Sequence, residues 1–312
     1  MNRKWAGALS ALTATAMWGG LYVVSDAVLD VIPPATFVLI RYLVALPVLG
    51  AALAKTRDRG IKRPDWPQLA LTAFVGFGVS LLAQFAGTKL STAAAGALIT
   101  SATPAFIVVF AWLILRERAS GRQWFGLVLA TIGVLIVTLV GNQPASVEAA
   151  DPLLGNFFLI LAAVSWALYS VMVKIHTRTY SALAVTLAVT AFGVPIVAPV
   201  AAIELQTQTI GVMTWPVIAG VLYVGVGCTA IAFFLWNKSF ELLDAASVSL
   251  FFFAQPVVGT ALSAIFRGQV LGASFFVGGG LILLGALLGM LSPSTASRRQ
   301  SVEKPASRAL VE

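Results

Sequence analysis

The chain has 312 residues, of which 59% are hydrophobic and only 10% are charged, and its mean hydropathy is +0.94. Because soluble domains carry about 25% charged residues, this composition excludes a soluble globular domain and predicts a polytopic membrane protein. The formal net charge of +8 does not indicate a nucleic-acid partner, because the basic residues are spread over short loops instead of forming one soluble patch.

Apolar runs of about 20 residues, the length that crosses the core of a bilayer, recur along the chain. They lie near residues 5–25, 34–54, 67–87, 93–115, 121–140, 153–173, 181–202, 212–236, 245–266 and 270–291. The first run begins like a signal peptide, but we expect it to be retained, because cleavage would remove most of a span. The sequence therefore predicts an all-α polytopic membrane protein with about ten transmembrane helices.

The chain repeats itself at a fixed spacing. Leu90–Pro104, which reads LSTAAAGALITSATP, returns in degraded form 152 positions later as Leu242–Pro256, which reads LLDAASVSLFFFAQP. At the same spacing, Gly126 matches Gly278. Such self-similarity indicates a duplicated unit, so we predict two related halves of five helices each.

Lysine and arginine in short loops predict the orientation. With the N-terminus inside, 17 of the 20 basic residues fall on the cytoplasmic side and only Lys89 and Arg267 fall outside, so both termini are predicted to be cytoplasmic. Because five spans per half is an odd number, the second half enters from the opposite face and the halves form an inverted repeat. The predicted parts are a first half at 1–140, a periplasmic linker at 141–152, a second half at 153–291 and a disordered cytoplasmic tail at 292–312.

A known family pattern runs through these spans. Its residues are Trp18-Gly19, Arg41-Tyr42, the run Pro104–Glu117, Gly126 and Gly133. Together they resemble the EamA branch of the drug/metabolite transporter superfamily, over about residues 5–291. The resemblance implies ten helices in two inverted halves, and within the family the chain is most similar to exporters of aromatic amino acids in the bacterial inner membrane. Gly268-Gln269 stands where a Gly-Glu pair is common, which argues against a mechanism needing a symmetrical pair of carboxylates.

Small and polar side chains recur at helical spacing on three spans, where such groups need a partner or contact with water. These stripes are Phe77, Ser80 and Gln84 on the third span, Thr92, Gly96, Thr100 and Thr103 on the fourth, and Ser247, Phe251 and Gln255 on the ninth. We interpret them as the lining of a substrate cavity, and the two amides are the strongest candidates because a buried amide needs several partners. The alternative is close helix packing, with threonine bonded back to its own helix.

Aromatic residues in mid-span form a second group of candidates. They are Trp18 with Tyr22 in the first helix, Trp166 with Tyr169 and Ser170 in the sixth, and Tyr223 in the eighth. We expect them to clamp a planar apolar substrate, with their N–H and O–H groups as polar contacts, although packing in an aromatic core is an alternative. Three other tryptophans near span ends are predicted to be interfacial anchors, namely Trp5, Trp112 and Trp236.

Arg41 is the only cation within a predicted span, where an uncompensated charge costs about 2.5–3.5 kcal/mol at mid-depth. Two roles are consistent with this position. The first is structural, in which the side chain reaches the outer headgroups or pairs with Asp26 or Asp30. The second is binding of a substrate carboxylate.

Nothing in the sequence supports metal, cofactor or catalytic chemistry. There is no H-E-x-x-H or P-loop pattern, and the single histidine, His176, is predicted to be a solvated loop residue without a second metal ligand. The G-x-G-x-x-A match at Gly225–Ala230 lacks the strand and soluble unit of a dinucleotide site and indicates helix packing. An intramembrane enzyme would need paired catalytic groups within the spans, and the sequence shows none. We therefore predict a protein that is not an enzyme and has no cofactor.

The predicted function is export of amino acids, aromatic or otherwise neutral, or of related small metabolites by alternating access. Because no acidic residue is apparent at mid-depth of a span, we predict facilitated diffusion down the substrate gradient. The alternative is a proton-coupled exporter of drugs or organic cations, and a channel would differ by flux that does not saturate. The expected partners are a small-molecule substrate and the lipid bilayer. The oligomeric state is open, and a monomer is compatible with the sequence.

Overall fold

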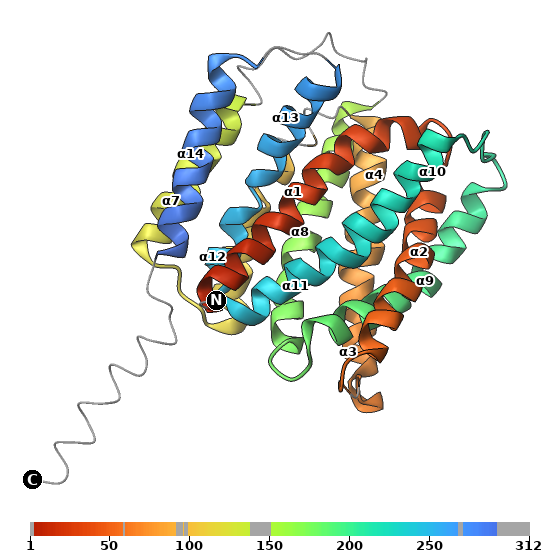
Figure 1. Cartoon of the computed structure of the whole chain (residues 1–312), viewed down its shortest axis with the longest axis horizontal. Helices are drawn as coiled ribbons and strands as arrows, with labels where there is room; N and C mark the ends of the chain where they lie inside the picture. The colour runs from red at the N-terminus through yellow and green to blue at the C-terminus, as the bar shows by residue number, and fades with distance from the viewer. Residues whose placement is uncertain are drawn as a thin grey trace, which may run out of the picture.

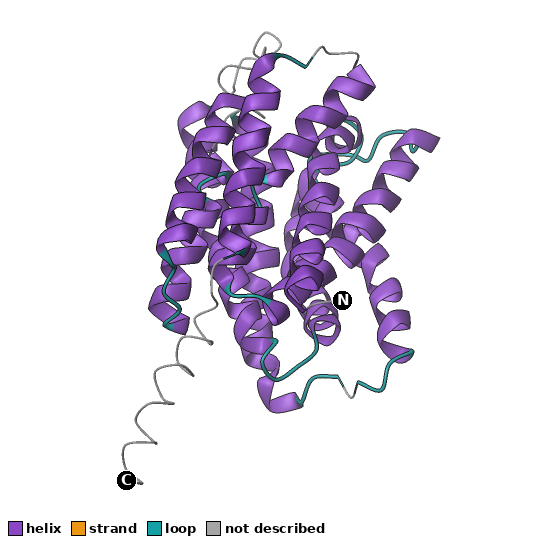
Figure 2. Ribbon diagram, turned by 60° about the vertical axis from the view of Figure 1, so that its left-hand side comes forward, coloured by secondary structure: helices purple, strands orange, loops and turns teal. Residues whose placement is uncertain are grey.

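The computed structural model describes residues 3–58, 60–91, 96, 99–137, 151–267 and 271–291, with side chains for all of these except 22, 23, 25–27, 263, 266 and 267. The described residues form helices and connecting turns without a strand (Figure 2), which confirms the all-α prediction. Seven helical segments in this part of the chain are long and apolar enough to cross a membrane, and two shorter apolar segments, Thr103–Leu115 and Gly121–Leu135, accompany them. The chain is therefore a multi-pass membrane protein. The predicted tail and residues 141–150 of the predicted linker lie outside the described residues.

The helices overlap all of the apolar runs found in the sequence. Those before the predicted linker are α1 (Arg3–Leu29), α2 (Pro34–Ala54), the short turn η1 (Arg63–Asp65), α3 (Trp66–Ala73), η2 (Phe74–Ser80), α4 (Leu81–Leu90), α6 (Thr103–Phe110), η3 (Ala111–Leu115) and α7 (Gly121–Leu135). Those after it are α8 (Pro152–His176), α9 (Ala182–Glu204), α10 (Trp215–Leu222), η5 (Tyr223–Ile231), α11 (Ala232–Leu242), α12 (Ala245–Phe251), α13 (Ala254–Arg267) and α14 (Ala273–Met290). α3, η2 and α4 form one continuous helix, and so do α10, η5 and α11.

Proline and capping side chains mark where several helices begin. Pro67 and Pro216 stand in the first turns of α3 and α10, where a backbone N–H would have no intrahelical partner. At the start of α7, Ser120 Oγ accepts the N–H of Gln123 at 3.3 Å, and Gln123 Oε1 accepts the N–H of Ser120 at 2.7 Å. This reciprocal capping box satisfies two donors that the helix itself leaves without acceptors.

Each of the two long continuous helices contains a π-helical segment at its centre, η2 in one and η5 in the other. These segments read FVGFGVS and YVGVGCTAI and begin 149 positions apart, so Gly76 and Gly78 match Gly225 and Gly227. The glycines permit close packing, since a Cβ at Gly76 would lie 2.3 Å from the ring of Tyr169. π-helical turns are frequent at functional sites, and this pair extends the internal repeat beyond the residues compared in the sequence analysis.

Helices from the two parts of the chain pack in matched pairs. α7 lies along α14 (Figure 1), where a Cβ at Gly126 would lie 2.5 Å from the carbonyl oxygen of Gly285 and a Cβ at Gly133 would lie 2.5 Å from that of Gly278. Residue numbers rise along α7 as they fall along α14, so the two helices run antiparallel. α2 likewise packs against α9, α1 against α11, and α4 against α8. Antiparallel packing of α7 and α14, which correspond in sequence, is the relation that an inverted repeat requires.

A polar cluster connects the two parts of the chain near the start of α1. Lys174 Nζ lies 3.4 Å from Glu117 Oε1 and also donates to the carbonyl oxygen of Leu243. Glu117 Oε2 accepts the backbone N–H of Ala245, the first residue of α12, at 3.0 Å. A carboxylate is favourable there because the N-terminus of a helix carries partial positive charge. The cluster therefore links the loop after η3 to α8 and α12.

Two predictions about side-chain exposure are wrong. Trp236, expected at an interface, is 0% exposed and its ring lies 5.4 Å from that of Trp18. His176, expected to be solvated, is 7% exposed, and its Nε2 lies 2.9 Å from Oγ1 of Thr72. Both errors have the same cause, because α11 continues to Leu242 and α8 to His176, beyond the ends predicted from the apolar runs.

Candidate functional site

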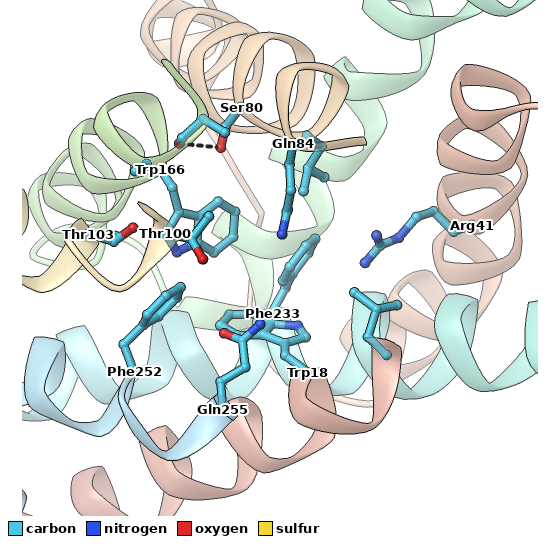
Figure 3. Close-up of a pocket in the computed structure, with 14 residues that line it drawn as sticks. Trp18, Arg41, Ser80, Gln84, Thr100, Thr103, Trp166, Phe233, Phe252 and Gln255 are labelled. Atoms are coloured by element: carbon cyan, nitrogen blue, oxygen red, sulfur yellow. Dashed lines mark hydrogen bonds between the residues drawn. The ribbon is translucent and has the colours of Figure 1, made fainter. Parts of the chain in front are cut away.

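A cavity of about 470 Å³, part of it open to solvent, lies in the middle of the helix bundle (Figure 3). Side chains from α1, α2, η2, α4 and α6 face side chains from α8, α11 and α13. Both parts of the chain thus contribute to its wall.

Many of the residues predicted to bind substrate line this cavity. They are Trp18, Ser80, Gln84, Thr100, Thr103, Trp166 and Gln255, and Arg41 joins them. Ser80 Oγ donates to the carbonyl oxygen of Ala162 at 2.9 Å, and both residues line the cavity. Thr100 Oγ1 bonds back to the carbonyl oxygen of Gly96 at 2.6 Å, so this residue both lines the cavity and bonds to its own helix.

Three predicted residues are buried but do not line the cavity, namely Phe77, Tyr169 and Ser170. The ring of Phe77 lies 4.8 Å from that of Phe233. Tyr169 Oη donates to Asn237 Oδ1 at 3.2 Å, and Ser170 Oγ donates to the carbonyl oxygen of Trp166 at 2.9 Å. Their hydrogen-bonding groups therefore have partners within the protein.

Three further predicted residues, Tyr223, Ser247 and Phe251, are also not part of the lining. Tyr223 Oη donates to the carbonyl oxygen of Met17 at 2.8 Å, Ser247 Oγ donates to Asp244 at the N-terminus of α12, and Phe251 is buried in the core. The side chains of Tyr22 and Asp26 lie outside the described residues, as does Thr92.

The sequence analysis missed Phe233 and Phe252, whose rings line the cavity. A signal for Phe233 was present, because it stands 149 positions after Gln84, the spacing that relates η2 to η5. Phe252 follows directly after the predicted Phe251. Only the break between α12 and α13 decides which of these two adjacent rings faces the cavity.

An aromatic wall forms one side of the cavity. The rings of Trp18 and Trp166 meet edge to face with centroids 5.4 Å apart and an interplanar angle of 83°, and the ring of Phe233 lies 5.4 Å from Trp18. Trp18 Nε1 donates to the carbonyl oxygen of Cys228 at 2.9 Å, which fixes this indole. Trp166 Nε1 is buried and has no hydrogen-bond partner among the described residues.

Arg41 points into the cavity from α2 (Figure 3) and is only 1% exposed. Its Nε donates to Thr229 Oγ1 at 2.7 Å, and its Cζ lies 5.5 Å from the centre of the Phe233 ring. One terminal nitrogen, Nη1, is buried and has no hydrogen-bond partner among the described residues. The guanidinium is therefore held inside the bundle and does not extend to the end of its helix. The side chain of Asp26, a predicted partner of Arg41, is not among the described ones.

The charge distribution of the lining is simple. Among the described residues that line the cavity, Arg41 is the only charged one, and the others are amides, hydroxyls, rings and aliphatic groups. The described part of the chain contains no group of three or more His, Cys, Asp and Glu side chains that could hold a metal ion. The cavity thus presents one positive charge beside neutral polar groups and an aromatic wall.

A central cavity enclosed by antiparallel, repeated membrane helices is the architecture of a membrane transporter. Comparison with known families agrees: the model of the EamA-like transporter family matches residues 5–139 and again residues 153–291. The chain belongs to the EamA-like transporter family.

Individual relatives extend over most of the chain. The uncharacterized transporter YetK of Bacillus subtilis is 28% identical over 282 residues, which cover 88% of this chain and 84% of that protein. A protein of Streptantibioticus cattleyicolor named "Probable terminal-alkyne amino-acid exporter" is 25% identical over 309 residues, which cover 97% of this chain and 98% of that protein. A crystal structure with a TM-score of 0.74 and 22% sequence identity covers 94% of this chain and 98% of its own chain, and it shows that the fold is shared.

Proposed function

We propose that the protein exports amino acids, aromatic or otherwise neutral, or related small metabolites across the bacterial inner membrane. The observation that carries this proposal is the cavity itself, in which amides, hydroxyls and a guanidinium face an aromatic wall. The name of the Streptantibioticus relative supports amino acids as the substrate class. The family pattern in the sequence supports the narrower likeness to the aromatic amino acid exporter YddG.

Alternating access is the proposed mechanism. The antiparallel packing of α7 with α14 and the matching π-helical segments support two inverted halves, 1–140 and 153–291, that rock about the cavity. In this arrangement ten helices span the membrane, residues 141–152 form a periplasmic linker, and both termini, including the tail at 292–312, lie in the cytoplasm.

The proposed transport is facilitated diffusion, which is not coupled to a proton gradient. A proton-coupled carrier places a titratable carboxylate or histidine in its pathway, and the described lining contains neither. The positive charge of Arg41 also opposes the alternative of an exporter for organic cations, because a like charge at the site disfavours a bound cation.

Counterflow in proteoliposomes tests the function. Liposomes loaded with unlabelled phenylalanine should accumulate external labelled phenylalanine, saturably and without a pH gradient. Trp18→Ala should reduce the rate at low substrate concentration about tenfold, because it removes a ring from the cavity wall. Trp112→Ala is the matched control, since Trp112 is 50% exposed on the bundle surface, and it should retain the wild-type rate. Absence of counterflow with every neutral amino acid would refute amino acid export, and flux that needs a pH gradient would refute facilitated diffusion.

A further inference from the structure

The guanidinium of Arg41 has unused hydrogen-bonding capacity at a buried position. An arginine carries five N–H donors, and the structure assigns one of them, on Nε, to Thr229. Nη1 has no acceptor among the described residues although the residue is 1% exposed. A buried charged donor without an acceptor is costly, so this nitrogen is placed to donate to an acceptor that the described residues do not supply.

Two contacts hold the guanidinium in place. Thr229 Oγ1 accepts from Arg41 Nε at 2.7 Å and donates to the carbonyl oxygen of Val224 at 2.7 Å, so its direction is determined by the π-helical turn η5. The Phe233 ring lies on another side, 5.5 Å away. Such fixed geometry reduces the entropy that a ligand would otherwise lose when it orders the side chain.

The opposite part of the cavity suits a ring. Trp18, Trp166 and Phe252 present apolar faces there (Figure 3), and Trp166 Nε1 is a second buried donor without a partner among the described residues. The side chains between the two parts, such as Gln84, are neutral. Among the described lining residues, a carboxylate that could receive an ammonium group is absent.

We infer that Arg41 receives the carboxylate of the transported substrate, and that the site selects organic carboxylates bearing an aromatic group without requiring an α-ammonium group. Arginine suits this role because its planar fork matches a carboxylate with two parallel hydrogen bonds. The inference rests on the proposed function in one respect only, namely that the cavity is the transport site. It names the chemistry by which that site recognises its substrate.

Three compounds that share a phenylethyl group test the inference by calorimetric binding to the purified full-length protein. Phenylalanine carries both charges, 3-phenylpropanoate only the carboxylate, and 2-phenylethylamine only the ammonium group. We expect 3-phenylpropanoate to bind at least as tightly as phenylalanine, and the amine to bind more weakly by about tenfold or more, as loss of a charge-assisted hydrogen bond predicts. Equal binding of the amine and the carboxylate would overturn the inference, and so would transport of phenylalanine without any binding of 3-phenylpropanoate.

Variants connect the preference to Arg41. Arg41→Gln should abolish the preference for the carboxylate over the amine, and Arg41→Lys should weaken it while retaining the charge. Thr229→Val leaves the guanidinium present but removes the acceptor that positions it, and should reduce carboxylate binding while binding of the amine is unchanged. A folded Arg41→Gln protein, monodisperse in detergent, that keeps the wild-type preference would overturn the inference. If Arg41→Gln does not fold, the Thr229→Val variant and the three-compound comparison on the wild-type protein decide whether the inference holds.

Failure of this inference is distinct from failure of the proposed function. Counterflow of phenylalanine that is unaffected by Arg41→Gln would leave the transporter proposal standing and remove the role of Arg41. Absence of counterflow together with tight binding of 3-phenylpropanoate would remove amino acid export and retain the carboxylate site.

Discussion

At the scale of single residues, the indole N–H groups of Trp18 and Trp166 differ in their hydrogen bonding. Trp18 Nε1 donates to the carbonyl oxygen of Cys228, whereas Trp166 Nε1 has no partner among the described residues. The first N–H therefore contributes to stability, and the second is available to a ligand.

Replacement of each indole by phenylalanine tests this difference. Trp18→Phe should lower the free energy of unfolding by about 1 kcal/mol more than Trp166→Phe, because only the former breaks a buried hydrogen bond. The measurement is titration with a denaturing detergent in micelles. Equal losses in the two variants would contradict the assigned hydrogen bonding.

At the scale of elements, glycines set how closely the paired helices approach. In α14, a Cβ at Gly285 would lie 2.5 Å from the carbonyl oxygen of Gly126 in α7, and this backbone atom cannot rotate away. Gly280, five residues earlier in the same helix, has nothing within 4 Å of such a Cβ. The two glycines therefore serve different purposes despite their common helix.

Alanine at these two positions provides a matched pair. Gly285→Ala should destabilise the protein by about 1–3 kcal/mol through overpacking against α7. Gly280→Ala should leave stability unchanged or raise it by about 0.5–1 kcal/mol, because alanine favours the helix. Thermal unfolding in detergent measures both. Similar stability of the two variants would show that α7 and α14 are not packed at the described distance.

At the scale of the whole molecule, the Glu117–Lys174 pair connects the two parts of the chain, while Lys238 and Glu241 form a pair within α11. The side chains of Glu117 and Lys174 are 19% and 10% exposed, and those of Lys238 and Glu241 are 35% and 24% exposed. The first pair must separate if the halves rock apart at that end, so its strength bears on the conformational equilibrium.

A double-mutant cycle measures that strength. Glu117→Gln and Lys174→Gln should each cost about 1–3 kcal/mol of unfolding free energy, since each leaves a largely buried partner without its counter-charge. The double variant should lose less than the sum of the two. Lys238→Gln is the control and should cost about 0.5 kcal/mol or less, because its pair is local and more exposed. Strict additivity in the first pair would exclude coupling between the two parts of the chain through this contact.

Sequence reasoning reached the helical architecture because bilayer spans require long apolar runs, and it found the duplication because Gly126 and Gly278 keep their spacing. It also identified the polar residues of the cavity, since a polar group in a membrane helix needs a hydrogen-bond partner or contact with water. It did not find Phe233, because an apolar ring in an apolar helix is not conspicuous and the 149-position spacing from Gln84 was not used. Nor could it choose between Phe251 and Phe252, since that depends on a break in the helix near mid-span.

The tryptophans around the cavity give the protein an optical consequence. The rings of Trp18, Trp166 and Trp236 lie with centroids 5.4 Å apart in the Trp18–Trp166 and Trp18–Trp236 pairs, close enough for their electronic transitions to couple. The resulting exciton bands in circular dichroism depend on the angle between the indoles. A change in that angle as the cavity opens or closes would therefore alter the spectrum of the unlabelled protein.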